Sequence, residues 1–230
     1  MRRLLLMVLL SSILFVPVAA NADWAENFDS YALGSGLHGQ GGWHGWDGSA
    51  TWDAYVSDAY ARSAPHSVAI AATSDMVHEY SGYTSGVWVY KAWQYIPTSF
   101  AGQSYILLLN TYNDGGPYNW STQVSFNSTT GTVVADPNGE SLPLIVGQWV
   151  EIRVVIDLDA NQQTFYYGNQ LLFQGSWTEG MSGGGILNIA AIDLFANNAG
   201  PIYYDDLMLA PDGPVPVETT SWGQIKATFK

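Results

Sequence analysis

The sequence predicts an all-β protein built as an antiparallel sandwich, and three features of the chain support this prediction. Apolar and polar residues alternate with a period of two in several segments, as in half-buried strands. Turn signals rich in glycine, asparagine and proline separate these segments at short intervals. No convincing amphipathic helix occurs between residues 23 and 210. Strands of this kind each give one face to a shared core, which is the arrangement of two packed antiparallel sheets.

Residues 148–158 give the clearest strand. One face is entirely aliphatic and consists of Val150, Ile152, Val154, Ile156 and Leu158. The other face consists of Trp149, Glu151, Arg153, Val155 and Asp157. Because successive side chains of a strand point to opposite faces, the aliphatic face is predicted to lie on the core.

Three further segments extend the pattern. Residues 164–167 and 170–173 are separated by Gly168 and Asn169, a two-residue turn typical of a β-hairpin. Residues 103–112 are apolar on both faces, which indicates a strand covered on both sides. Residues 86–96 alternate so that one face carries Trp88, Tyr90, Ala92 and Gln94.

The two ends of the chain differ from this middle part. Arg2 and Arg3 precede an apolar run, and residues 20–22 read Ala-Asn-Ala, so residues 1–22 are predicted to be a cleaved signal peptide rather than a membrane anchor. Residues 23–210 form the predicted sandwich domain. Residues 211–230 begin with a proline-rich linker and end in a short tail, which is either a docking helix for cell-surface attachment or a frayed end.

Composition narrows the possible partners. Cleavage after residue 22 removes two of the seven basic residues and no acidic residue, which changes the formal charge from −13 to −15. Such a chain is unsuited to nucleic acids or anionic membranes, which require clustered Lys and Arg. The chain has no cysteine, so disulfides and thiolate metal sites are excluded. A secreted or cell-surface protein without a membrane span after processing is the expected product.

Three segments in order resemble a known superfamily. Residues 26–34 are followed by Gly42-Trp43 and Gly45-Trp46, residues 147–159 lead into residues 167–169, and residues 202–209 read IYYDDLML. This order resembles the concanavalin A-like lectin/glucanase superfamily in its laminin-G-like exported bacterial form. The resemblance covers residues 24–210 and implies a jelly roll in which the first strand pairs beside the last. The superfamily includes lectins, glycanases, lyases and adhesion domains, so the fold alone does not define the activity.

The motifs of the enzymes in this superfamily are absent. Retaining glycanases need two carboxyl groups about 5 to 5.5 Å apart, and this superfamily presents them as E-x-D-x-E on one strand. Glu151 and Asp157 are six residues apart, and Asp157 and Asp159 fall at the end of a strand. Neither the lyase pattern Q-x-H nor a zinc motif such as H-E-x-x-H occurs. We therefore predict no catalytic residues.

Four carboxylates near the two ends of the domain form a predicted calcium site. Asp205 and Asp206 are consecutive, so their side chains are expected on opposite faces, one facing solvent and the other buried or at the sheet edge. The segment expected beside them carries Glu26 and Asp29. Ca²⁺ prefers six to eight oxygen ligands, and related jelly-roll modules often hold structural Ca²⁺ at this junction. The alternative is that the buried Asp accepts hydrogen bonds from backbone amides or from a tyrosine hydroxyl.

Aromatic residues suggest a glycan site. The chain has 10 tryptophans and 14 tyrosines, and sugar rings stack on aromatic faces, although aromatic residues also fill cores. Trp43 is expected to plug the edge of the sandwich. The predicted ligand-binding residues are Trp88, Tyr90 and Gln94 on one strand face, Tyr112, Asn113 and Tyr118 from a loop, and Trp46.

These observations predict a secreted, non-catalytic carbohydrate-binding domain that is stabilised by calcium and binds an extracellular polysaccharide. Two alternatives stay open. The first is a structural or adhesion protein of the cell surface, and the second is a polysaccharide hydrolase or lyase with an unrecognised site.

Overall fold

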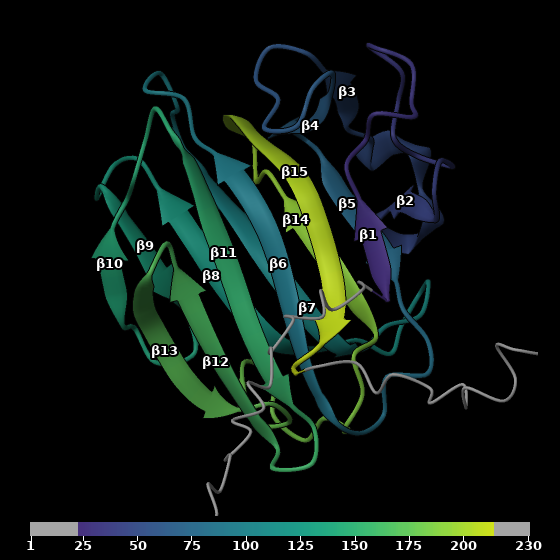
Figure 1. Cartoon of the computed structure of the whole chain (residues 1–230), viewed down its shortest axis with the longest axis vertical. Helices are drawn as coiled ribbons and strands as arrows, with labels where there is room; N and C mark the ends of the chain where they lie inside the picture. Colours follow the sequence, from purple (N-terminus) through teal and green to yellow (C-terminus); the bar gives the residue numbers. More distant parts are fainter. Residues whose placement is uncertain (1–22, 214–230) are drawn as a thin grey trace, which may run out of the picture. The chain divides into compact units, whose positions relative to one another are not determined.

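A computed structural model describes residues 23–213, which form two antiparallel β-sheets packed face to face. The predicted signal peptide and most of the predicted tail lie outside these residues. In Figure 1 the strands of one sheet cross in front of the fainter strands of the other. The predicted all-β jelly-roll sandwich is confirmed. No helix of the described part is both long enough and apolar enough to cross a membrane.

The first sheet has eight strands in the order β13-β12-β11-β6-β15-β4-β3, with β1 paired to β15 beside this path. Its strands are β1 (Trp24–Glu26), β3 (Tyr55–Ser57), β4 (Ser67–Ala72), β6 (Val87–Tyr95), β11 (Trp149–Asp157), β12 (Gln162–Tyr167), β13 (Gln170–Ser176) and β15 (Ala199–Pro211). The predicted hairpin is β12–β13, and Gly168 has the positive φ of 59° that its tight turn needs.

The second sheet has seven strands in the order β10-β9-β8-β7-β14-β5-β2. Its strands are β2 (Trp43–Gly45), β5 (Asp75–Glu79), β7 (Gln103–Thr111), β8 (Asn119–Asn127), β9 (Thr132–Ala135), β10 (Ser141–Pro143) and β14 (Ala191–Phe195). Two short 3₁₀ segments, η1 (Trp46–Gly48) and η2 (Ala50–Trp52), follow β2.

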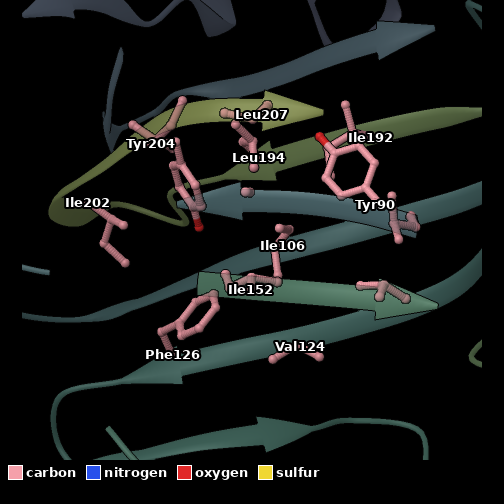
Figure 2. Packing of buried hydrophobic residues seen from close by; sticks show 14 of the residues in the cluster. Tyr90, Ile106, Val124, Phe126, Ile152, Ile192, Leu194, Ile202, Tyr204 and Leu207 are labelled. Carbon is pink, nitrogen blue, oxygen red and sulfur yellow. The ribbon is translucent and has the colours of Figure 1, made fainter. Parts of the chain in front are cut away.

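The core lies between the two sheets, and apolar side chains from both converge there. Figure 2 shows Tyr90, Ile152 and Tyr204 of the eight-stranded sheet facing the layer that holds Ile106 and Leu194 of the seven-stranded sheet. The whole aliphatic face of β11 is buried, as the alternation predicted. Burial of apolar surface at about 25 cal/mol per Å² is the main force that holds such sheets together.

The first and last strands pair, as the resemblance implied. Trp24 lies opposite Leu209 and Glu26 lies opposite Leu207 in the antiparallel register of β1 and β15. Trp43 is 1% exposed and contacts the rings of Trp24 and Phe28. Its predicted role as a plug at the sandwich edge is confirmed.

The face of β6 that the sequence analysis assigned to a groove is the core face. Tyr90 and Gln94 are 0% exposed, and Trp88 is half-buried against the core with its ring edge on Tyr83. Both faces of β6 carry aromatic residues, since Trp93 and Tyr95 occupy the other face. Alternation alone therefore could not choose between them, and the assignment of these three residues to an exposed surface is corrected.

Candidate functional site

The outer face of the seven-stranded sheet carries polar and aromatic side chains in cross-strand rows. Asp193 of β14 lies between Leu107 of β7 and Val77 of β5. Two residues along, Phe195 of β14 lies between Tyr105 of β7 and Asp75 of β5. Asp75 and Asp193 are thus diagonal neighbours on one face, although they are far apart in the sequence.

A second apolar cluster covers part of this outer face. Val77, Leu107 and Leu109 are buried there, beneath aromatic residues that come from β8 and from the loops after β2 and β7. The ring of Trp46 lies nearly parallel to that of Trp120, with centroids 5.9 Å apart. These rings form a wall that rises above the sheet, because aromatic pairs pack well in offset stacks.

A pocket of about 380 Å³ opens beside this wall. Its lining residues come from four strands and two loops and are Trp46, Asp75, Tyr105, Leu107, Trp120, Gln123, Asp193, Phe195 and Asn197. Tyr105 and Phe195 form a second stacked pair with centroids 5.7 Å apart. The pocket therefore combines two stacked aromatic pairs with carboxyl and amide groups, a composition typical of small-molecule sites.

The two carboxyl groups of the pocket form a proton-sharing pair. Burial, followed by the charge of Asp75, raises the pKa of Asp193 well above its ordinary value. Burial also raises the pKa of Asp75, and the hydrogen bond that protonated Asp193 donates to it opposes this rise. Two carboxyl groups this close do not readily ionise together, so the pair retains one proton beyond the pH at which an isolated Asp loses it.

Apart from each other, the two carboxyls lack hydrogen-bond donors within residues 23–213. Asp75 Oδ1 and Asp193 Oδ1 are buried and accept no hydrogen bond from the described residues. Asp193 is only 3% exposed. A buried acceptor without a donor is costly, so this carboxyl pair, which lines the pocket, is its group best suited to receive donors from a ligand.

Gln123 is held in place at the rim. Its Nε2 donates to Asp136 Oδ2 at 2.7 Å, and Asp136 Oδ1 accepts from Ser125 Oγ at 2.9 Å. This contact fixes the side chain of Gln123, which leaves its amide oxygen as an oriented acceptor beside the pocket.

The loop residues predicted to bind a ligand lie around this pocket with different roles. Trp46 lines it. Tyr112 is buried against Trp46, and its hydroxyl donates to Asp114 at 3.0 Å and accepts from the backbone N–H of Asp47 at 3.0 Å. Tyr118 packs on Trp46 and donates to Asp47. Tyr112 and Tyr118 thus support Trp46, whereas exposed Asn113 lies in the adjoining turn and outside the lining.

The other predicted ligand-binding residues, Trp88, Tyr90 and Gln94, lie on the opposite sheet. Gln94 Nε2 donates to the hydroxyl of Tyr204 at 2.8 Å within the core. Trp88 Nε1 donates to the carbonyl oxygen of Ser85 at 2.8 Å. The structure therefore brings together the loop part of the predicted site but not the strand part.

The four residues predicted to bind calcium lie near the junction of β1 and β15. Glu26 and Asp206 line a depression of about 630 Å³ beside this junction. Asp205 is fully buried and Asp206 is half-buried. Asp205 lies opposite Trp93 on the outer face of the eight-stranded sheet, where the backbone of Arg62 and Ser63 covers it. Asp206 has a φ of 45° at an irregularity in the pairing of β15 with β6. The hydroxyl of Ser63 contacts both carboxylates, at 3.5 Å from Asp205 Oδ1 and 2.8 Å from Asp206 Oδ1.

Protein donors occupy all four carboxylates. Asp205 accepts from the backbone N–H groups of Arg62, Ser63 and Asp206, and Arg62 pairs with Asp206. Glu26 accepts from Tyr31 and from the N–H of Phe28, and Asp29 accepts from the N–H of His66.

The backbone N–H donors of Asp205 match the alternative interpretation, in which the buried Asp is a structural hydrogen-bond acceptor. Burial raises the pKa of Asp205 to about 6, and its backbone donors oppose the rise. No group of three or more acidic, histidine or cysteine side chains within residues 23–213 has the arrangement of a metal site. The geometry therefore does not fit a calcium site, and calcium binding stays a prediction.

The sequence analysis missed Asp75, Asp193 and Trp120. One signal was present: Asp193 is a lone carboxyl in the otherwise apolar strand β14 (Ala191–Phe195). A carboxyl at such a position must be buried or line a pocket. Its partner could not be found in the same way, since Asp75 begins β5 and looks like an ordinary strand-end residue.

Comparison with solved structures shows the fold. A carbohydrate esterase from the Shiga toxin-encoding bacteriophage phi24B is 14% identical, with a TM-score of 0.53 over 85% of this chain and 100% of that one. The alginate lyase Aly36B, solved with an alginate tetrasaccharide, is 13% identical, with a TM-score of 0.52 over 84% and 98%. The cellulose-induced protein Cip1 is 11% identical, with a TM-score of 0.50 over 82% and 97%.

Sequence comparison adds no closer relation, since no family model and no curated protein matches the chain. At these identities the structural likeness concerns the fold alone. The chain has the jelly-roll sandwich fold of these proteins, consistent with the concanavalin A-like superfamily that its sequence resembles.

Proposed function

We propose that the protein is a secreted, non-catalytic carbohydrate-binding protein and that its glycan site is the pocket on the outer face of the seven-stranded sheet. The observation that carries the proposal is the composition of the pocket: two stacked aromatic pairs beside carboxyl and amide groups. Aromatic faces suit the C–H face of a sugar ring, and the polar groups suit its hydroxyls. The names of the three structural neighbours, which include a lyase and an esterase of carbohydrates, support this substrate class.

The test is a binding measurement on two matched tryptophan variants. Soluble oligosaccharides are titrated into the protein by isothermal calorimetry, after a glycan array has identified a binder. Trp120→Ala removes one wall of the pocket, and we expect binding to weaken about tenfold or more, equivalent to about 1.4 kcal/mol. Trp149→Ala is the control, because Trp149 is half-buried on the outer face of the other sheet.

Both variants must first show a cooperative unfolding transition, so that a loss of binding is not a loss of fold. Equal binding by both variants and the unaltered protein would refute the assignment of the pocket. An absence of binding to every glycan on the array would refute the function itself. Export is tested separately, by N-terminal sequencing of the protein from the culture medium, with Asp23 as the expected first residue.

A hydrolytic activity is the second candidate, and the Asp75–Asp193 pair favours it. A carboxyl with a raised pKa, such as Asp193, suits the role of general acid, which is one of the two carboxyl roles in glycoside hydrolysis. A reducing-sugar assay on the glycans that bind distinguishes the two candidates. Release of reducing ends that Asp193→Asn abolishes would establish an enzyme and refute the non-catalytic proposal.

A further inference from the structure

The charges of the sandwich are distributed unequally between its two outer faces. The described residues contain three basic side chains, Arg62, Lys91 and Arg153. Lys91 lies 3.6 Å from Glu151, and the guanidinium of Arg153 covers the ring of Tyr166, all on the outer face of the eight-stranded sheet. Arg62 pairs with Asp206 and covers Trp93 of the same face.

None of these three basic side chains contacts the outer face of the seven-stranded sheet, which carries several carboxylates. The carboxylates on or beside it are Asp47, Asp75, Glu79, Asp114, Asp136 and Asp193. The histidine is His44, which lies 3.2 Å from Glu79. An anionic ligand would therefore meet repulsion there without a compensating Lys or Arg.

Besides the negative charge of this face, the pocket contains carboxyl oxygens that lack hydrogen-bond donors in the described part of the chain. Asp75 Oδ1 and Asp193 Oδ1 accept nothing from the described residues, although Asp193 is 3% exposed. By contrast, the equally buried Asp205 receives three backbone N–H groups. Two acceptors on one pair, in a pocket without a cation, call for a ligand that brings both donors and positive charge.

The aromatic walls suit the same ligand. A cation over the face of Trp or Tyr is attracted by the ring quadrupole, by about 0.5–1 kcal/mol at exposed sites and more when water is excluded. Trp46, Trp120 and Tyr105 all line the pocket that contains the two carboxyls. An ammonium group held there has a carboxyl pair beneath it and π-faces around it, while the sugar carbons contact the rings.

We infer that the ligand of this site is a polysaccharide of amino sugars with free amino groups, and that one ammonium group binds to the Asp75–Asp193 pair. This inference rests on the proposed glycan site. A primary ammonium supplies a charge and three donors at one atom. A neutral sugar supplies hydroxyl donors but no charge. An N-acetylated amino sugar loses the charge and adds bulk at the same atom.

The test compares four oligosaccharides of equal length by isothermal calorimetry: glucosamine, N-acetylglucosamine, cellulose and alginate oligomers. We expect the glucosamine oligomer to bind about tenfold or more tightly than its N-acetylated form. We expect no binding of the alginate oligomer. The cellulose oligomer shows what the aromatic walls contribute without an amine.

A lysine oligomer of equal charge controls for the acidity of the whole protein. Equal affinity for the lysine and glucosamine oligomers would overturn the inference, since recognition would then be by charge alone. Glucosamine binding no tighter than that of the N-acetylated or cellulose oligomer would also overturn it, but would leave the proposed glycan site intact. Failure of all four glycans to bind would overturn the inference, whereas the proposed function falls only if no glycan on the array binds.

Two variants that each remove one negative charge test whether the preference for the glucosamine oligomer arises in the pocket. Asp75→Asn removes a charge inside the pocket, and we expect it to reduce the preference for the glucosamine oligomer to about twofold or less. Glu79→Gln removes one charge from the same face but outside the pocket lining, so the preference should persist. Equal behaviour of the two variants would overturn the inference. If Asp75→Asn fails to fold, Asp193→Asn takes its place, and the ligand series on the unaltered protein decides by itself.

Discussion

Two pairs of aspartates occupy opposite faces of this sandwich and have opposite surroundings. Asp205 and Asp206 are surrounded by donors: three backbone N–H groups, a serine hydroxyl and Arg62. Asp75 and Asp193 have only each other as a side-chain partner, and their buried Oδ1 atoms accept from no other described group. The comparison shows that burial of a carboxyl does not by itself indicate a binding site. The supply of donors separates a structural carboxyl from a candidate ligand contact.

The largest expected change in stability follows from the removal of Asp205, the buried member of the structural pair Asp205–Asp206. Asp205→Ala leaves the buried N–H groups of Arg62 and Ser63 without an acceptor, at about 1–3 kcal/mol for each unsatisfied group. We expect the free energy of unfolding to fall by about 3 kcal/mol at neutral pH, measured by urea denaturation. Asp206→Asn is the control, since asparagine tolerates the positive φ at that position and should cost less than about 1 kcal/mol. Similar costs for the two variants would show that Asp205 does not organise this junction.

Removal of a carboxyl from the pocket pair should stabilise the protein at neutral pH, whereas removal of Asp205 should destabilise it. The pKa of Asp193 is raised in the folded protein, so the unfolded chain loses this proton at a lower pH than the folded chain does. The free energy of unfolding therefore decreases as pH rises above about 4, the ordinary pKa of Asp. Asp193→Asn removes this loss, and we expect the variant to be more stable than the unaltered protein at pH 7 and equal to it near pH 4.

Urea denaturation of both proteins at the two pH values measures this difference. Asp157→Asn is a suitable control, because Asp157 accepts from the backbone N–H of Ala160 in an exposed turn of the other sheet. A variant that is destabilised equally at pH 4 and pH 7 would show that the carboxyl of Asp193 is a satisfied structural group, and the contrast between the two pairs would disappear.

The smallest expected effect concerns calcium at the structural pair. A Ca²⁺ ion present at a hundred times its Kd would stabilise the fold by about 2.7 kcal/mol. Because protein donors already occupy Glu26, Asp29, Asp205 and Asp206, we expect the unfolding midpoint to be the same in calcium chloride and in EDTA. A calcium-dependent rise that Asp206→Asn abolishes would restore the predicted site and show that Arg62 gives way to the ion.

Local alternation in the sequence was enough to determine the strands and much of the core. The aliphatic stripe of β11 and the β12–β13 hairpin follow from a period of two and from turn chemistry. The pairing of β1 with β15 followed from the resemblance, and the structure confirms it. These features depend on neighbours in the chain or on a motif order that the chain itself displays.

The tertiary structure alone decided which faces and which distant residues form the candidate site. Strand β6 has aromatic residues on both faces, so its alternation is compatible with either orientation, and only packing against the second sheet buries Tyr90 and Gln94. Asp75 and Asp193 become neighbours because β5 and β14 are adjacent in the order of the seven-stranded sheet. Strand order in an antiparallel sheet depends on long-range pairing, which no local pattern specifies.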